Sequence, residues 1–295
     1  MGPVVAARRV GMTERNDEFS LSVILILRCA AMCYVHLMWK PLLILFSFLL
    51  AAPAWANSAA EVRGLIAAGD YETARVTAES LETAEGYALA AESLSAQILL
   101  GEVDKLNKQS KEARDLAEKA LALDAENYNA KLQYALSDGF VTRTSNNITA
   151  WRKKLPMKTL GRIETFRQAY PEDPRGIALE AAWHMGVVRK AGEKNGGKWF
   201  GASLGEGERL YAEAMRLAPN DILIETNYAL SLLVLDVERY GPQVQPILEA
   251  VATMPANDDL YRKVQSKAAK VLAAYGDDRK VKKFAGRFLD GEALE

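Results

Sequence analysis

From about residue 58 onward, apolar residues recur at the spacing of a helix and do not alternate as they would along a half-buried strand. The segment 110–124 shows this most clearly, because its apolar residues fall on one helical face: Ala113, Leu116, Ala117, Ala120 and Leu121. The segment 203–217 repeats the pattern. No run rich in Val and Ile with a period of two lies between turn signals. The sequence therefore predicts an all-α fold.

Several polar residues mark where these helices are expected to begin. Ser58 and Ser203 each stand three residues before a glutamate, which is the arrangement of a capping box. We therefore expect the first helix to open at Ser58. The acidic pairs at 258–259 and 277–278 are also expected at helix starts, where carboxylates accept hydrogen bonds from unpaired N–H groups. The second pair would open a closing helix with a solvated basic face.

The helical pattern is organised in repeats. The tripeptide Tyr-Ala-Leu occurs at 134–136 and again at 228–230, with similar residues around both copies. Junctions between apolar runs recur at Ala125, Pro171, Pro219 and Pro255, which are 46, 48 and 36 residues apart. A period of this length is typical of helical-repeat proteins, in which each unit buries its apolar face against its neighbours.

The small residues of these units carry a family resemblance. Gly69 and Tyr71 flank a predicted turn before Ala74, and small residues recur within the predicted helices at Ala120, Ala135, Ala214 and Ala229. The pattern resembles tetratricopeptide repeats, which are pairs of antiparallel helices stacked into an α-solenoid. The resemblance covers residues 58–295, with unit spacings that depart from the family's period of about 34 residues. It implies a domain over 57–295 that binds other proteins.

An export signal precedes the repeats. Lys40 is followed by an apolar run from Leu42 to Leu50 and then by Ala54-Trp55-Ala56, which are the three parts of a signal peptide over residues 38–56. Cleavage after Ala56 would place the mature protein in the periplasm or outside the cell. We expect residues 1–37 to be a mis-assigned or disordered extension preceding a start at Met38, although a long charged leader is an alternative.

Composition then narrows the chemistry. Of 37 basic and 38 acidic residues, five and three lie before residue 57, which leaves 32 and 35 and a net charge of −3. This balance does not favour nucleic acid as a partner. Both cysteines lie upstream of the cleavage site, so the mature chain has no thiol chemistry or disulfide. His184 is its single histidine, either a ligand contact or a packed side chain. We expect no metal site, no cofactor and no enzymatic activity.

Two stretches interrupt the repeats and are expected to leave the stack as irregular segments. The first, 142–158, is polar and contains Pro156, which should break a helix. Its basic part beginning at Trp151 would contact an acidic partner or lipid headgroups, or would be only a solvated loop. The second, 192–202, contains four glycines and the adjacent aromatics Trp199 and Phe200. If exposed, these aromatics indicate an interaction surface; if folded back, they belong to the core.

The tetratricopeptide resemblance also implies a binding face. In that family the first helix of each unit lines a concave groove. Counting from the junctions places Thr226 and Leu230 on this face in one unit, and Leu132 and Leu136 in another. The alternative is that neighbouring helices simply bury these side chains.

These observations predict an exported, non-enzymatic scaffold that binds a protein or peptide partner in envelope assembly or transport. An alternative is a small-molecule or lipid-binding protein similar to the helical T-component of TRAP-type transporters, and an enzyme is a third class. An open groove would favour a peptide, whereas a closed apolar pocket would favour a small ligand. We expect no membrane-spanning segment after cleavage, and the sequence leaves the oligomeric state open.

Overall fold

The computed structural model describes the backbone of residues 54–294 and the side chains from Ser58 to Leu294. Within this part of the chain every regular element is helical and no strand occurs, which confirms the all-α class. The segment Trp55–Glu295 forms a compact unit of its own. The predicted signal peptide and the extension before it lie outside the described residues, apart from the backbone at 54–56.

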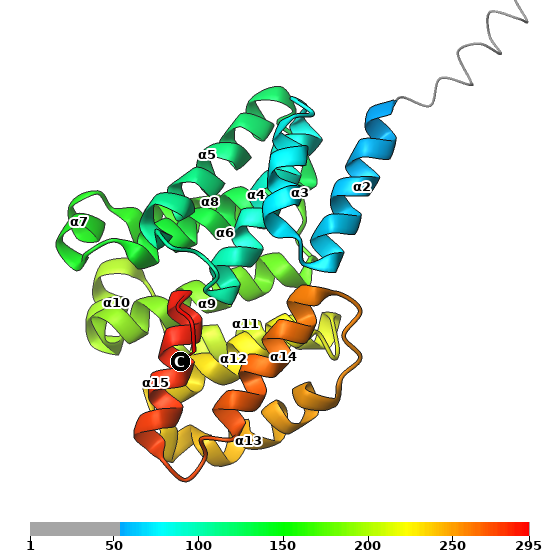
Figure 1. The fold of residues 1–295 in the computed structure, drawn as a ribbon. Coiled ribbons are helices and arrows are strands. Elements are labelled where there is room, and N and C mark those ends of the chain that lie inside the picture. The colour runs from blue at the N-terminus through cyan, green and yellow to red at the C-terminus, as the bar shows by residue number, and fades with distance from the viewer. Residues whose placement is uncertain (1–53, 295) are drawn as a thin grey trace, which may run out of the picture. The chain divides into compact units, whose positions relative to one another are not determined.

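Neighbouring helices pair into hairpins that stack side by side (Figure 1). The first helices of the hairpins are α2 (Ala54–Ala68), α4 (Ala84–Leu100), α6 (Tyr128–Thr144), α9 (Pro174–Ala191), α12 (Ile222–Leu235) and α14 (Asp259–Leu272). Their partners are α3 (Tyr71–Glu79), α5 (Leu106–Leu123), α8 (Leu155–Ala169), α11 (Leu204–Leu217), α13 (Val237–Thr253) and α15 (Asp278–Asp290). Two short helices, α7 (Asn147–Arg152) and α10 (Glu193–Phe200), interrupt the third and fourth hairpins.

The turns between hairpins use one recurring device. A side chain at the end of each turn accepts a hydrogen bond from a backbone N–H of the next helix, at 2.8 to 3.0 Å; these residues are Thr83, Asn127, Asp173, Asp221 and Asp258. Such caps satisfy donors that have no partner within the helix. All four sequence-predicted junctions lie in these turns. Ser203 caps α11 and Asp277 caps α15, as predicted.

Three local expectations were wrong. The first described helix, α2, begins at Ala54, so Ser58 lies inside it and does not open it. The two predicted irregular segments instead contain α7 and α10. Pro156 lies in the first turn of α8, where a proline is compatible with a helix because its missing N–H would have no partner there. Gly192 and Gly201 flank α10 with φ of 76° and 73°, so the chain reverses at both ends of this helix.

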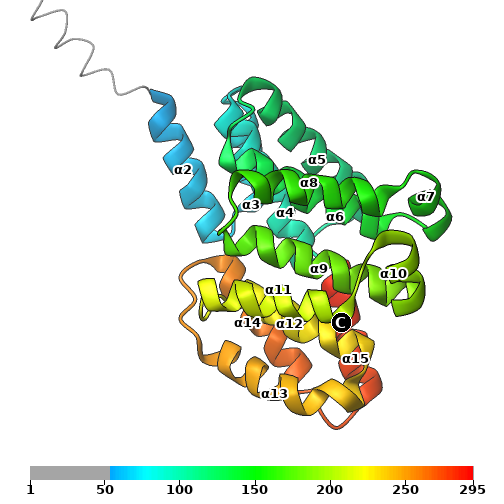
Figure 2. The same cartoon turned by 180° about the vertical axis from the view of Figure 1, so that it is seen from behind.

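The last hairpin folds back over the side on which the first helices lie. α15 packs against α12, and both helices contribute to one hydrophobic core. Near the end of α15, Arg143 of α6 donates a hydrogen bond to the Leu289 carbonyl. Arg189 of α9 binds Asp290 through two contacts of 2.5 and 3.1 Å. The C-terminal end of α15 therefore contacts both α6 and α9 (Figures 1 and 2).

The beginning and end of the array also touch. The Tyr71 hydroxyl donates to Asp259 at 3.2 Å, and Lys263 pairs with Glu102 at 2.9 Å across 161 residues of sequence. Gly101 ends α4 with φ of 62°, and a Cβ there would lie 2.5 Å from the Glu292 backbone. Only glycine allows the C-terminal segment to approach α4 this closely. The array consequently closes on itself.

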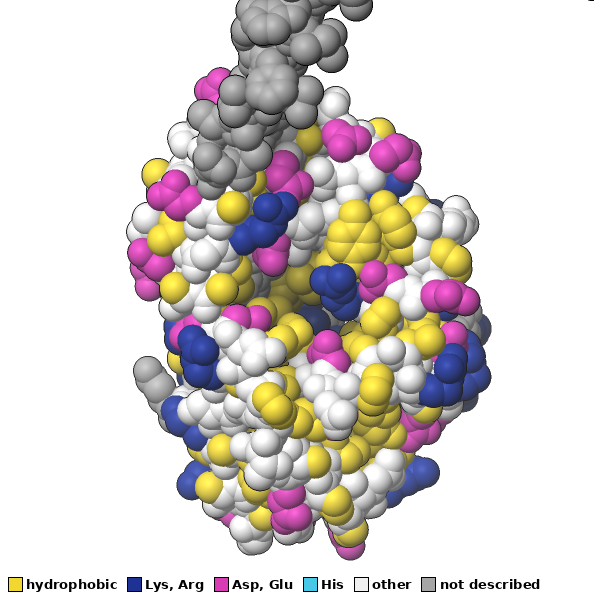
Figure 3. All heavy atoms as spheres, turned by 90° about the vertical axis from the view of Figure 1, so that its right-hand side faces the viewer, with side chains coloured by type: hydrophobic (Ala, Val, Ile, Leu, Met, Phe, Trp, Pro, Cys, Tyr) yellow, Lys and Arg dark blue, Asp and Glu magenta, His cyan; other side chains and the backbone are white. Residues whose placement is uncertain are grey.

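The exposed surface differs between the two sides of the array. On the right-hand side of Figure 1, acidic and basic side chains are interspersed with apolar ones around a hollow (Figure 3). The large apolar side chains exposed in the described part of the chain are Val76, Leu123, Ile148, Trp151, Met157 and Trp199. Four of these six lie in or beside α7 and α10, on the opposite side.

Ala229 tests the close packing of the hairpins, because it is completely buried in α12. We expect Ala229→Leu to lower the free energy of unfolding by about 1–3 kcal/mol through overpacking. Urea denaturation of residues 57–295 measures this change. The matched control is Ala250→Leu on α13, where the alanine is exposed and the change should be nearly neutral. Equal effects of the two substitutions would show that α12 has no close contact at residue 229.

Candidate functional site

A cavity of about 340 Å³ lies among α6, α8 and α9, and residues of α7 and α10 complete its lining. Its volume falls within the range of small-molecule sites. Gly186 and Lys190 belong to the lining and are exposed, so solvent reaches the cavity. The two short helices that interrupt the hairpins are therefore part of the candidate site.

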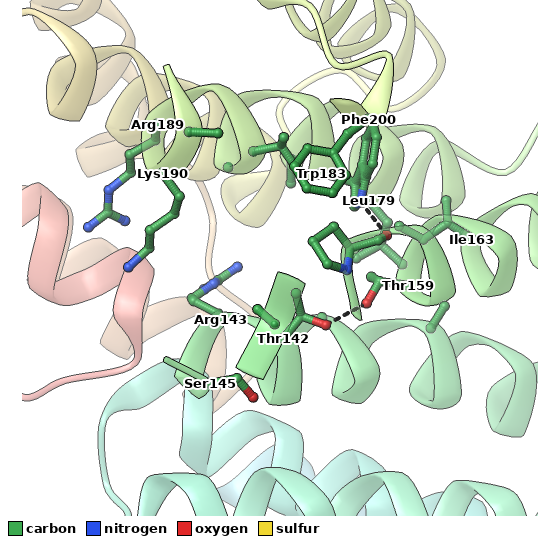
Figure 4. A pocket seen from close by; sticks show the side chains of 18 of the residues that line it. Thr142, Arg143, Ser145, Thr159, Ile163, Leu179, Trp183, Arg189, Lys190 and Phe200 are labelled. Atoms are coloured by element: carbon green, nitrogen blue, oxygen red, sulfur yellow. Dashed lines mark hydrogen bonds between the residues drawn. The ribbon is translucent and has the colours of Figure 1, made fainter. Parts of the chain in front are cut away.

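The greater part of the lining is apolar. Ile163 of α8, Leu179 and Trp183 of α9, and Phe200 of α10 gather at one end (Figure 4). The Trp183 ring is held in place because its Nε1 donates a 2.8 Å hydrogen bond to the carbonyl of Pro156. This end offers a preformed apolar and aromatic surface to a ligand.

Cations occupy the other end of the cavity. Figure 4 shows Arg143, Arg189 and Lys190 there, away from the aromatic rings. Asp290 is the acidic neighbour of this group: it pairs closely with Arg189 and lies 3.9 Å from Lys190. Among the described residues, no carboxylate lies within ion-pair distance of Arg143. Burial lowers the pKa of Arg143, and the charge of Asp290 offsets this only in part.

The charge of this end is therefore incompletely balanced within the protein. Three cations share one close carboxylate, and the least compensated cation is the most deeply placed. A buried cation without a counter-ion is unfavourable, so an anionic group in the cavity would interact favourably with it.

The empty space depends on two glycines in the middle of helices. A Cβ at Gly186 of α9 would meet no atom within 4 Å, and one at Gly139 of α6 would only touch the Thr159 side chain at 3.9 Å. Glycine costs about 1 kcal/mol relative to alanine inside a helix. Neither glycine is therefore required by close packing, and both leave room in the cavity.

Three sequence-predicted residues lie at this site. Leu136 and Phe200 line the cavity and are half-buried. Trp199 is 54% exposed, and its ring packs edge-on against Trp151 with the centroids 6.1 Å apart. The two adjacent aromatics therefore have different environments: Phe200 points into the cavity, and Trp199 lies on the surface.

Three of the four proposed groove residues lie outside the cavity. Thr226 and Leu230 are completely buried, and Leu132 is 7% exposed. Both α14 and α15 pack against α12, and apolar residues of the three helices belong to one hydrophobic core. Their burial corresponds to the alternative of packing against neighbouring helices, and a binding role for these residues stays a prediction.

His184 has a structural position. It is buried in α9 and does not line the cavity. Its Nδ1 accepts a 3.1 Å hydrogen bond from the backbone N–H of Ser203, the residue that caps α11. His184 thus joins the two helices of the fourth hairpin, which corresponds to the packed histidine considered above.

Sequence reasoning missed the cationic end and the glycines. The signal was present in α9, because Leu179, Trp183, Gly186 and Lys190 follow one another at helical spacing. Along this face of α9 the side chains change from apolar, at Leu179 and Trp183, to none at Gly186 and then to a cation at Lys190. Arg143 had no such signal, because its approach to the cavity depends on how α6 packs against α9.

We expect the free energy of unfolding of residues 57–295 to decrease as the pH falls below about 6.5. Burial lowers the pKa of His184 in the folded protein, so the unfolded chain binds more protons in this range and is favoured. Asn in place of His184 retains a hydrogen-bond acceptor but cannot take up this proton.

Urea denaturation between pH 7.5 and 5.5 should therefore show a steeper loss of stability in the wild type than in His184→Asn. Comparing the two proteins separates His184 from Glu92 and Glu225, whose pKa values burial raises. Parallel curves would contradict a lowered pKa of His184 in the folded protein.

Other kinds of site find no support among residues 54–294. No group of three or more His, Cys, Asp or Glu side chains in this range could hold a metal ion. No helix within it is both long and apolar enough to cross a bilayer.

A scan of the chain against protein-family models finds no match, and a search of curated proteins finds no related sequence. The functional argument therefore depends on the chemistry of the cavity.

Proposed function

We propose that residues 57–295 form an exported, tetratricopeptide-like binding protein that holds a small amphipathic anion in the cavity. The apolar part of the ligand would lie against Trp183, Phe200 and Ile163. Its anionic group, such as a carboxylate or a phosphate, would lie near Arg143, Arg189 and Lys190. The observation that carries this proposal is the placement of an apolar lining and partly uncompensated cations at opposite ends of one cavity.

The cavity favours a small ligand over an extended peptide. A peptide-binding solenoid needs an open groove along its first helices, and α15 covers that side at α12. The space that remains is bounded by α6, α8 and α9 and has the volume of a small-molecule site. We therefore favour the ligand-binding alternative over a scaffold with a concave peptide groove.

Two features support the tetratricopeptide-like part of the proposal. The hairpins are joined by short turns, and buried alanines recur in their helices at Ala120, Ala135, Ala214 and Ala229. The turn between α2 and α3 has Gly69 at φ 86° followed by the buried Tyr71. Export is proposed from the signal-like sequence at 38–56. Together these features are similar to those of the T-component class named above.

Gly186→Leu provides an occlusion test. Its side chain would project into the cavity, and replacing a helical glycine should not reduce stability. We expect the wild-type segment 57–295 to bind the fluorescent carboxylate 11-(dansylamino)undecanoate, and we expect Gly186→Leu to weaken this binding at least tenfold. Displacement by dodecanoate should be stronger than by dodecanol, and dodecyltrimethylammonium should displace least.

The matched control is Gly161→Leu. Gly161 is also exposed in a helix with no atom within 4 Å of its Cβ position, but it does not line the cavity. This variant should bind the probe as the wild type does. Equal binding by all three proteins, or equal displacement by the three chain compounds, would contradict the proposed site.

A further inference from the structure

The exposed apolar residues near the cavity form a second functional feature. We define the rim as residues 147–158 and 193–200, which comprise α7, the start of α8 and α10. Its exposed apolar side chains are Ile148, Trp151, Met157 and Trp199, with exposed fractions of 73, 57, 43 and 54%. The Trp151 and Trp199 rings are in contact, and adjoining exposed apolar side chains of this size are uncommon away from interaction sites.

The rim is also strongly basic. It contains one acidic residue, Glu193, and six exposed basic ones: Arg152, Lys153, Lys154, Lys158, Lys194 and Lys198. Its net charge is therefore +5, whereas residues 57–295 as a whole carry −3. None of the six forms an ion pair with another described residue, so their charges are available to an external partner.

The two halves of the rim meet in space. The Trp151 and Trp199 rings are in edge contact, which brings α7 and α10 together although they are far apart in sequence. Trp151 and Pro156 of the first half and Phe200 of the second also line the cavity. The rim therefore adjoins the candidate site.

We propose that the rim docks on an anionic lipid bilayer, with its apolar side chains in the interface and its basic side chains at the headgroups. Tryptophan is favoured at this depth, and lysine can extend its charged end to the headgroup level. Each basic side chain near an anionic surface contributes about 1 kcal/mol, or about fivefold in partitioning. A bilayer suits these exposed apolar side chains, because it needs no matching shape.

Docking in this orientation would place the cavity next to the bilayer. An amphipathic ligand could then pass between lipid and protein with little exposure to water. This consequence requires the proposed ligand site, but the docking itself does not.

The test is co-sedimentation of residues 57–295 with vesicles of phosphatidylglycerol and phosphatidylcholine. The segment is used without residues 42–50, since that apolar run would itself insert into lipid. We expect binding to vesicles rich in phosphatidylglycerol, little binding to pure phosphatidylcholine, and release as salt is raised. Lys153→Gln with Lys158→Gln should lower the partition coefficient about twenty-five-fold.

Two further variants separate charge, apolar contact and ligand binding. Arg279→Gln with Lys283→Gln removes the same charge from the exposed start of α15 and should have much less effect. Ile148→Ser with Trp199→Ser should weaken docking severalfold even at low salt. Neither residue lines the cavity, so probe binding should be unchanged.

Gly186→Leu, which blocks the ligand site, should dock like the wild type. Docking by this variant without probe binding would therefore support the rim independently of the proposed function. Absence of binding to anionic vesicles would overturn the docking proposal and would leave an acidic protein as the alternative partner. Equal losses in the rim variant and the α15 charge variant would also overturn it, because they would indicate a nonspecific charge effect.

Discussion

The return of α15 across the array is the contact on which the rest of the structure depends. Its apolar face packs on α12, and its end receives Arg143 and Arg189 from α6 and α9. Thr226 and Leu230 of α12, which the tetratricopeptide resemblance placed on a groove, are completely buried. The same return places Asp290 beside the cations of the cavity, so closure of the array and the charge of the candidate site have one structural origin.

The cavity exists where the hairpins are interrupted. α7 and α10 leave the stack between paired helices, and their side chains line a space that regular hairpins would fill. Gly139 and Gly186 keep this space open from within. The inserted helices also carry Trp151 and Trp199 and three of the six basic side chains of the rim. Ligand binding and lipid docking would therefore be functions of the insertions, whereas the regular hairpins provide the support.

The sequence predicted those parts of the fold that depend on local chemistry. Helical periodicity identified the all-α class, and the recurring junctions at Ala125, Pro171, Pro219 and Pro255 located four of the turns. It did not predict that α15 would cover α12, because that contact joins distant residues whose apolar faces could also pack elsewhere. For the same reason the sequence left open whether Trp199 and Phe200 are exposed or folded back, and the approach of Arg143 to the cavity was missed. Gly186 could have been recognised from the sequence, because glycine destabilises the interior of a helix and often marks a packing or functional requirement there.

Zero-length carbodiimide cross-linking of residues 57–295 tests closure most directly. Lys263 lies 2.9 Å from Glu102 of the first half and 3.0 Å from Asp259 of its own helix. Closure predicts that mass spectrometry will find both Lys263–Glu102 and Lys263–Asp259 amides, and that mixing isotope-labelled and unlabelled protein will show both to be intramolecular. A Lys263–Asp259 product without Lys263–Glu102, or a Lys263–Glu102 product formed only between copies, would contradict the closed array.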